Sequence, residues 1–311
     1  MHVSVLLDEA IDALAIKPSG IYVDGTFGRG GHSTRILSQL NEHGRLIAFD
    51  KDTSAIAVGN ATQDKRFCIV HASFSEVQQR LRQMEITHID GMLLDLGVSS
   101  PQLEDASRGF SFQSTGPLDM RMDVTRGVTA AEWIATATED ELKWVIKEYG
   151  EERYAQQIAR AIIVARTRQP IDTTWQLAKI IAGVVRSRQR QREIMRHPAT
   201  RTFQAIRIHI NQELKELSVT LPQSIELLSV GGRLVVISFH SLEDRLVKQF
   251  MQRETGVPSL PRQIPLTQEE LQHWGKQKLR RIGKIRPGSD ELKNNPRARS
   301  AIMRVVERIA Q

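Results

Sequence analysis

A glycine-rich turn, DGTFGRGGH at 24–32, carries the residues whose types and spacing most clearly suggest chemistry. Asp24 ends an apolar run, and three glycines follow it: Gly28, Gly30 and Gly31. Glycine allows positive φ and lets a ligand approach main-chain atoms closely. Asp50 closes the next apolar run, where a carboxylate can accept hydrogen bonds from ribose hydroxyls. The pattern predicts a nucleoside site; the alternative is a tight turn with two solvated acids.

The acid that begins this turn bears on which nucleoside is bound. In a dinucleotide-binding turn, the pyrophosphate lies on a helix N-terminus. Asp24 would repel a pyrophosphate, and Thr26 stands where G-x-G-x-x-G has a glycine. The positively charged methionine end of S-adenosylmethionine suits an acid, so the turn favours this cofactor over NAD. Phe74, just past the third apolar run, either covers the adenine or is a core aromatic.

A second polar group, DLGVSSPQL at 95–103, follows the fourth apolar run. Methylating an exocyclic base amine is difficult because the nitrogen lone pair is delocalised into the ring. Acceptors that hold the amino hydrogens can push the nitrogen toward sp³ geometry and align it for in-line attack. Asp95, Ser99 and Ser100 are the candidates for this catalytic role. A proline-terminated loop with capping serines is the alternative.

His240 begins a third group, HSLEDR at 240–245, after the last long apolar run. Its acidic neighbours suggest acid/base work or positioning of the base, and a helix cap is an equal alternative. The sequence has no G-x-S-x-G elbow, which argues against a serine hydrolase. It also lacks H-E-x-x-H and has a single cysteine, Cys68, so we expect no catalytic metal and no internal disulfide.

The elements that must position these residues alternate as strands and helices. Such alternation predicts an α/β fold with a parallel sheet and right-handed crossovers. We expect strands at 21–26, 45–50, 66–72 and 88–97, with helices at 30–40 and 74–84. A helix end and turn at 227–233 then lead into a further strand at 234–240. A βαβ unit needs only about 30 residues, so roughly 100 residues between the last two strands must be an insertion.

The insertion is predicted to be helical. Three pairs have capping-box form ahead of apolar-periodic stretches: Thr129 with Glu132, Thr138 with Glu141, and Thr173 with Gln176. A further helix is expected at 202–217. We place a discontinuous catalytic domain at 1–104 and 209–311, and the inserted domain at 105–208. The segment 255–299 is expected to be a long mobile loop, and 300–309 a final, antiparallel edge strand.

The composition limits the compartment and the partners. The chain has 311 residues, a net charge of +7 and a pI of about 9.7. Such a charge favours polyanion partners, although a merely basic enzyme would share it. No apolar run approaches the ~20 residues that cross a bilayer. MHVSVLLDEAIDAL at the N-terminus has acids in its apolar stretch and is no signal peptide, so we expect a cytoplasmic protein with no membrane partner.

Eight segments together resemble the RsmH (MraW) family of bacterial ribosomal RNA small-subunit methyltransferases. They are HVSVLLDEA, DGTFGRGGHS, DLGVSSPQL, RGFSF with GPLDMRMD, YGEERYA, HPATRTFQAIRI, GGRLVVISFHSLEDR and NPRARSA. The resemblance runs from His2 to Arg299 and is weaker in RSRQRQR at 186–192. It implies a class I, Rossmann-like S-adenosylmethionine-dependent methyltransferase fold that is interrupted by a helical substrate-recognition domain.

The resemblance also implies an activity and a set of contacts. The activity is methylation of the N4 amine of a decoding-region cytidine in 16S rRNA, in an assembled or nearly assembled 30S subunit. A homodimer is possible. The implied cofactor contacts are Gly30, Gly31, His32, Asp50, Phe74, Asp95 and Gln102.

RNA contacts are expected from the basic loop at 276–299 and from six arginines: Arg108, Arg121, Arg126, Arg196, Arg201 and Arg207. Taken singly, each arginine is better explained by a solvated helix face, so the expectation rests on the six together. Extrusion of the target base from folded RNA is the expected route. A nicotinamide oxidoreductase and a non-catalytic RNA-binding assembly factor are the rival functions.

Overall fold

The computed structural model describes residues 4–186, 197–256 and 277–310. Its contacts divide the chain into two compact units, and each is described by itself. The first unit combines Met1–Gly97 with Leu214–Gln311, and the second is Val98–Glu213. Among the helices of the described ranges, none is both long and apolar enough to cross a membrane.

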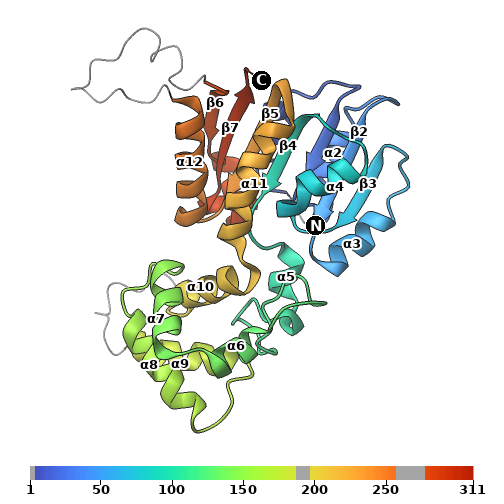
Figure 1. Ribbon diagram of the computed structural model, residues 1–311. Helices are drawn as coiled ribbons and strands as arrows, with labels where there is room; N and C mark the ends of the chain where they lie inside the picture. Colours follow the sequence, from blue (N-terminus) through green and yellow to red (C-terminus); the bar gives the residue numbers. More distant parts are fainter. Residues whose placement is uncertain (1–3, 187–196, 257–276, 311) are drawn as a thin grey trace, which may run out of the picture. The chain divides into compact units, whose positions relative to one another are not determined.

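A seven-stranded sheet in the order β3-β2-β1-β4-β5-β7-β6 forms the centre of the first unit (Figure 1). The strands are β1 Ile21–Asp24, β2 Arg45–Asp50, β3 Phe67–His71, β4 Ile89–Asp95, β5 Leu228–Ser238, β6 Leu279–Ile285 and β7 Ile302–Arg308. The first five run parallel, whereas β7 lies antiparallel between β5 and β6. A dinucleotide-binding sheet is parallel with the order 3-2-1-4-5-6. The antiparallel β7 therefore distinguishes this sheet, and the predicted class I methyltransferase fold is confirmed.

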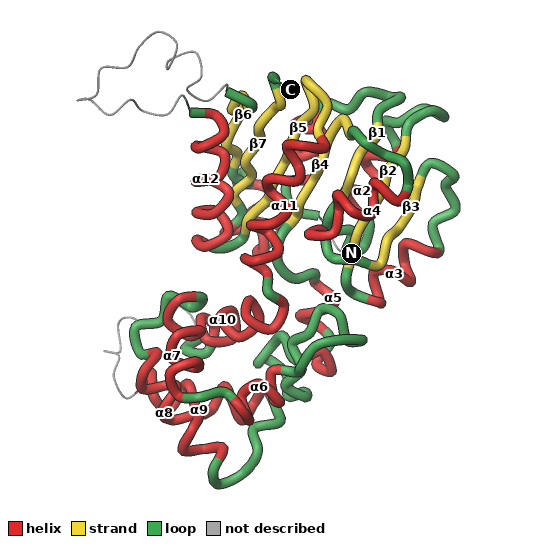
Figure 2. Tube along the Cα trace, in the orientation of Figure 1, coloured by secondary structure: helices red, strands yellow, loops and turns green. Residues whose placement is uncertain are grey.

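Helices cover both faces of this sheet (Figure 2). They are α1 Leu7–Leu14, α2 Gly31–Leu37, α3 Thr53–Asn60, η1 Phe74–Glu76, α4 Val77–Gln83, α11 Glu213–Leu227, α12 Ser241–Thr255, α14 Ser289–Asn294 and η4 Pro296–Ser300. Successive strand residues point to opposite faces. Leu93 thus joins the core under α1 and α2, while Met92 and Leu94 join the core under α4, α11 and α12. Burial on both faces explains why these strands read as continuous apolar runs.

The second unit is helical. Its helices are α5 Ser100–Glu104, η2 Ala106–Arg108, α6 Ala130–Thr136, α7 Glu139–Glu148, α8 Ala155–Arg166, α9 Thr174–Arg186 and α10 Thr200–Asn211. They enclose a core of their own, with Leu142, Ile158, Leu177 and Phe203 among its buried members. All three predicted capping boxes form, at Thr129, Thr138 and Thr173.

The prediction of one continuous helix at 202–217 is wrong. α10 ends at Asn211, Gln212 takes a left-handed φ of 52°, and α11 begins at Glu213. Asn211 uses its side chain to bind the backbone of Met120 and Met122, which ties this end of α10 to a distant loop. The apolar spacing continues across the break, so periodicity alone could not reveal it. The two compact units divide at this same point.

The predicted loop at 255–299 is also wrong where the structure describes it. Residues 277–299 contain β6, α14 and most of η4. β6 pairs outside β7, so β7 is antiparallel as expected but is not the edge strand. Leu279 is the buried residue of β6, and the others are exposed or half-buried, so the strand lacks the apolar alternation by which strands are predicted. The turn expected at 227–233 likewise belongs largely to β5, which begins at Leu228.

Candidate active site

Three carboxylates lie at the carboxyl ends of three neighbouring strands. Asp24 ends β1, Asp50 ends β2 and Asp95 ends β4, and the sheet order places β1 between the other two. The chain moves from β1 to β2 on one side and returns to β4 on the other. Ligands of open α/β sheets bind at such a switch point, outside the carboxyl ends of the strands. This edge is therefore the candidate active site.

Asp24 is buried, with 1% of its surface exposed. Its Oδ1 accepts a hydrogen bond from the Thr26 N–H at 3.0 Å, and its Oδ2 accepts one from the Ser33 hydroxyl at 2.7 Å. Burial raises the pKa of Asp24 against the opposing effect of these hydrogen bonds. Because both oxygens are used within the chain, Asp24 organises the turn and places a negative charge beneath it.

Asp50 is oriented by two backbone donors. Its Oδ2 accepts from the Gly28 N–H at 2.7 Å and its Oδ1 from the Asp52 N–H at 2.8 Å. Burial raises the pKa of Asp50 to about 6, although the two N–H groups favour the charged form. The residue is only half-buried, and each carboxylate oxygen has a second lone pair. Asp50 can therefore accept further hydrogen bonds from ligand hydroxyls.

Asp95 offers an unsatisfied acceptor. Its backbone N–H donates to the Thr26 hydroxyl at 2.7 Å, which ties the end of β4 to the glycine-rich turn. Its Oδ1 is buried and, within the part of the chain that the structure describes, has no hydrogen-bond partner. Burial, followed by the nearby charges of Asp24 and Glu243, raises the pKa of Asp95 well above its usual range. A cationic or hydrogen-bond-donating ligand would satisfy this carboxylate.

The glycines of the turn meet specific steric needs. Gly30 has a φ of +77° directly before α2, a conformation that side chains disfavour. A Cβ on Gly31 would lie 2.0 Å from the Ser4 hydroxyl oxygen, so a side chain there would displace the N-terminal segment. The sequence interpretation, that glycines keep the backbone of this turn accessible, agrees with this geometry. The carboxylates of the sheet edge and the glycine backbone of the turn together fit a ligand that carries a positive charge and ribose hydroxyls.

His32 and Phe74 are the other cofactor contacts implied within the first unit. His32 is buried at the start of α2, and its Nε2 lies 3.2 Å from the Val5 carbonyl oxygen. Its Nδ1 lies 3.7 Å from Asp95 Oδ2, so the histidine belongs to the acidic edge. Phe74 begins η1 and packs against the core of one sheet face. Phe74 is therefore a core aromatic in this structure, and its contact with the adenine stays a prediction.

His240 caps α12. Its Nδ1 accepts from the Glu243 N–H at 3.3 Å, while Glu243 Oε2 accepts from the Phe239 N–H at 2.8 Å. Glu243 Oε1 also lies 3.1 Å from His240 Nε2. The helix-cap alternative is therefore what the geometry shows, and a catalytic role for His240 stays a prediction. Glu243 was expected to take part either in acid/base chemistry or in the cap, and its electrostatic effect on Asp95 was not predicted.

The remaining catalytic candidates belong to the second unit. Ser99 precedes α5, and its N–H donates to the Gln102 side-chain oxygen at 2.9 Å in a capping box. Ser100 and Gln102 are both buried. The local structure thus agrees with the alternative given for this segment, a loop with capping serines. The roles of Ser99 and Ser100 in catalysis and of Gln102 in cofactor binding stay predictions.

The arginines predicted to contact RNA make several intramolecular contacts. Arg108 donates to the carbonyls of Arg121 and Met122. Three others form ion pairs: Arg121 with Asp119, Arg126 with Asp123, and Arg207 with Glu213. Arg207 is mostly buried in a two-bond pair, so it stabilises the link between α10 and α11. Arg201 is exposed, and Arg196 lies outside the described residues.

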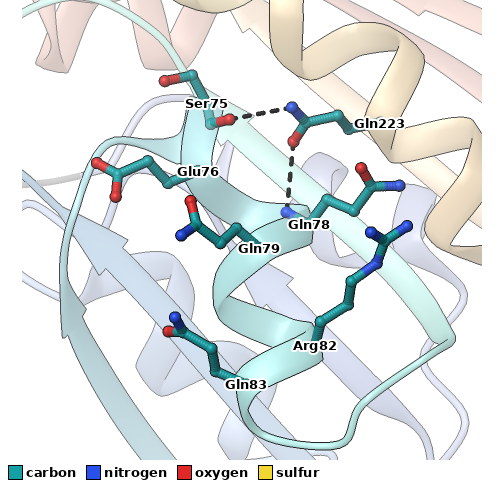
Figure 3. Close-up of a pocket in the computed structure, with 7 residues that line it drawn as sticks. All are labelled: Ser75, Glu76, Gln78, Gln79, Arg82, Gln83 and Gln223. Atoms are coloured by element: carbon teal, nitrogen blue, oxygen red, sulfur yellow. Dashed lines mark hydrogen bonds between the residues drawn. The ribbon is translucent and has the colours of Figure 1, made fainter.

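A surface pocket of about 460 Å³ lies elsewhere on the first unit (Figure 3). Its lining is mainly amide side chains of α4 and α11: Ser75, Glu76, Gln78, Gln79, Arg82, Gln83 and Gln223. Gln223 is held in place because its side chain donates to the Ser75 carbonyl and accepts from the Gln78 N–H. None of the three strand-end acids lines this pocket, so it is separate from the candidate active site.

Comparison with known proteins identifies the family. The profile of the MraW methylase family matches residues 1–309. A relative from Nitrosomonas eutropha, named Ribosomal RNA small subunit methyltransferase H, is 62% identical over 99% of this chain and 98% of its own length. A relative of the same name from Nitrosomonas europaea is 63% identical over the same shares. The solved structure of an rRNA methylase from Streptococcus thermophilus aligns over 100% of both chains, at 11% identity and a TM-score of 0.43.

The family profile and the relatives agree over nearly the whole chain, and the carboxylates at the sheet edge suit a cationic nucleoside cofactor. The chain belongs to the MraW methylase family, whose methyl donor is S-adenosylmethionine.

Proposed function

We propose that this protein methylates the exocyclic N4 amine of a decoding-region cytidine in 16S rRNA, within an assembled or nearly assembled 30S subunit in the cytoplasm. The names of the 62–63% identical relatives support small-subunit ribosomal RNA as the substrate class. The resemblance of the motifs to the RsmH family supports the cytidine amine. The structural observation that carries the proposal is the buried Oδ1 of Asp95 at the switch point of the sheet, for which the described ranges of the chain offer no hydrogen-bond partner.

The methyl donor supplies an electrophilic methyl group on a positively charged sulfur. Asp50 accepts hydrogen bonds from its ribose, since the carboxylate is held in place by the N–H groups of Gly28 and Asp52. Asp95 and the negative charge of Asp24 stabilise the cationic end of the donor. The turn between β1 and α2 lets this end approach the backbone because Gly30 and Gly31 carry no side chains.

The amine must be activated and then lose a proton. An acceptor that holds one amino hydrogen weakens the conjugation of N4 with the ring and directs its lone pair toward the methyl carbon. As the bond between N4 and the methyl carbon forms, the bond between sulfur and that carbon breaks. The donor leaves as neutral S-adenosylhomocysteine, and the N4 group carries the positive charge and one proton too many. Asp95, with its raised pKa, suits the acceptance of this proton. Ser99, Ser100 and His240 are the further candidates for holding or orienting the base.

The charge distribution supports a polyanionic substrate. Residues 277–311 contain ten Lys and Arg against three Asp and Glu, an excess that equals the +7 net charge of the whole chain. Arg281 and Lys284 are exposed on β6. Such cations contribute to RNA affinity by releasing counterions from phosphates. The basic loop at 276–299 was expected to contact RNA, and this role stays a proposal now that β6 is seen within it.

The test incubates the protein with tritiated S-adenosylmethionine and small subunits from a strain that lacks the modification. The RNA is then digested and the labelled nucleoside is identified. We expect labelled N4-methylcytidine, with strong loss of label for Asp95→Ala and normal labelling for Asp8→Asn, an exposed carboxylate 74% accessible to solvent. Label at a cytidine carbon, or in protein alone, would show that the proposed reaction is wrong. Binding to the subunit without transfer would favour an assembly factor.

A further inference from the structure

Leu6 has a backbone conformation that a leucine rarely adopts. Its φ is 52° and its ψ is 39°, and the residue is fully buried just before α1. The left-handed conformation is unfavourable for a residue with a Cβ, because the Cβ comes too close to the following carbonyl oxygen. Such strain persists only where surrounding contacts hold it, and it concentrates at functional sites. A contact elsewhere in the chain is therefore expected to hold Leu6 in this conformation.

Glu291 supplies that contact from the far end of the chain. Its Oε1 accepts a hydrogen bond from the Leu6 N–H at 2.8 Å, across 285 residues of sequence. Glu291 lies on α14, in the C-terminal part that sequence patterns predicted to be a mobile loop. Hydrogen bonds to a charged group are among the stronger ones in proteins, so this contact can hold Leu6 in its strained conformation.

The peptide that Glu291 holds also faces the cofactor site. The Val5 carbonyl, which precedes the Leu6 N–H in the same peptide group, lies 3.2 Å from His32 Nε2. A carbonyl oxygen can only accept a hydrogen bond, so Nε2 carries the proton of the imidazole. In the neutral ring, Nδ1 is then an acceptor, and it lies 3.7 Å from Asp95 Oδ2. One side of the peptide thus binds Glu291, and the other fixes the ring that faces Asp95.

We propose that Glu291 is a positioning residue of the methyl-donor site: it holds the peptide between Val5 and Leu6, which in turn fixes the orientation and tautomer of His32 beside Asp95. This inference rests on the proposed use of Asp95 by the cofactor. Without the hydrogen bond, Leu6 relaxes toward an ordinary conformation and the Val5 carbonyl turns away from His32. The imidazole can then exchange tautomers, and the ring of His32 is no longer held in one orientation beside Asp95.

Charge is a second way in which Glu291 can act, and it must be separated from positioning. The groups around Asp95 are Asp24 on β1, His32 on α2, Glu243 on α12 and Glu291 on α14. The negative charge of Glu291 favours the protonated form of Asp95. A substitution that removes both the charge and the hydrogen bond would leave these two effects mixed.

Two conservative substitutions separate them. Glu291→Gln keeps an oxygen at the same reach and removes the charge, whereas Glu291→Asp keeps the charge and withdraws it by one methylene. Asp290→Ala is the matched control, because Asp290 lies next to Glu291 on α14 and its side chain is 87% exposed. Each variant is titrated with S-adenosylhomocysteine by calorimetry, and ¹⁵N spectra of labelled histidine report the tautomer of His32. Subtraction of a His32→Gln spectrum assigns the signal.

We expect Glu291→Asp to weaken S-adenosylhomocysteine binding about tenfold, as the loss of a charge-assisted hydrogen bond implies. Its KM for the methyl donor should rise similarly while kcat at saturation stays within about twofold. The His32 spectrum should change from protonated Nε2 to a mixture of tautomers. Glu291→Gln and Asp290→Ala should keep the wild-type tautomer and bind within about threefold of wild type.

The reverse pattern, with weak binding by the Gln variant and normal binding by the Asp variant, would show that charge acts and positioning does not. Normal binding and an unchanged His32 tautomer in both variants would also overturn the proposal. These measurements need no RNA. A failure to form N4-methylcytidine, with normal cofactor binding, would therefore contradict the proposed function alone.

Discussion

Replacing Asp50 by asparagine should remove most of the pH dependence of cofactor binding between pH 5 and 7.5. The pKa of Asp50 is about 6 in the unliganded protein, because burial outweighs the two backbone N–H groups that favour the charged form. Ribose hydroxyls donate to the carboxylate, so the cofactor binds its ionised form more tightly. Affinity in the wild type is therefore full above pH 6 and decreases as the pH falls below it.

The size of the change in Kd follows from the pKa of Asp50, which is about 6. At pH 7.5 nearly every Asp50 is ionised, and at pH 5 about one in eleven is, so the Kd should rise about tenfold. An amide makes weaker hydrogen bonds than a carboxylate, and Asp50→Asn should bind about tenfold more weakly at pH 7.5. The Kd values of variant and wild type should then converge near pH 5.

In the unliganded protein, the same raised pKa makes the free energy of unfolding decrease as the pH rises, whereas the cofactor affinity increases. Protonation of Asp50 stabilises the fold below the unfolded value of 3.8, and this contribution is lost as the pH rises through 6. The amount is up to about 3 kcal/mol. Asp50→Asn removes this dependence as well, so urea denaturation from about pH 4 to pH 7, which covers the interval between 3.8 and 6, provides an independent measurement.

The assay is calorimetric titration with S-adenosylhomocysteine at half-unit pH steps, with Asp8→Asn as the control. Asp95 also titrates in this site, so the informative quantity is the difference in slope between wild type and Asp50→Asn. Equal slopes would refute the assignment of the pH dependence to Asp50. A variant that binds more tightly than wild type at pH 7.5 would refute the role of its charge.

Substitutions at four further positions test the cofactor turn, the α12 cap and the proposed RNA contacts of β6. Gly31→Ala should weaken cofactor binding at least tenfold because its Cβ would meet the Ser4 hydroxyl at 2.0 Å, and the double variant Ser4→Ala/Gly31→Ala should recover most of the affinity in the same titration. His240→Ala should lower the free energy of unfolding by about 1 kcal/mol through loss of the α12 cap, as measured with urea; an unchanged single-turnover rate would exclude catalysis by His240. Arg281→Ala and Lys284→Ala should each reduce the salt dependence of small-subunit binding by about one phosphate contact, and unchanged slopes would place RNA elsewhere.

Most of the parallel part of the sheet could be predicted because β1, β2, β4 and β5 are largely buried. Strands such as LIAF at 46–49 read as apolar runs, and three of the strands, β1, β2 and β4, end in an acid at one edge of the sheet. Asp24, Asp50 and Asp95 were therefore found from the sequence. β6 was missed because its side chains, apart from that of Leu279, are exposed or half-buried. Its backbone hydrogen bonds to β7 place no requirement on residue type.

The hydrogen bonds that adjust the site could not be predicted. Ser33 binds Asp24 across a turn whose path depends on Gly30, and Glu291 reaches Leu6 only once the whole sheet has formed. His240 shows another limit. Its neighbours were equally consistent with a cap and with acid/base chemistry, and the contact with Glu243 establishes the cap without testing the chemistry.

The bond between Leu6 and Glu291 also has a consequence for synthesis on the ribosome. The first four strands leave the exit tunnel long before β5, β7 and α14, so an early intermediate has the acidic edge but lacks the residue that holds the N-terminal segment against it. Contacts at such sequence separation form late, since their chain entropy must be overcome first. A nascent chain is therefore expected to bind the methyl donor poorly until its last residues emerge.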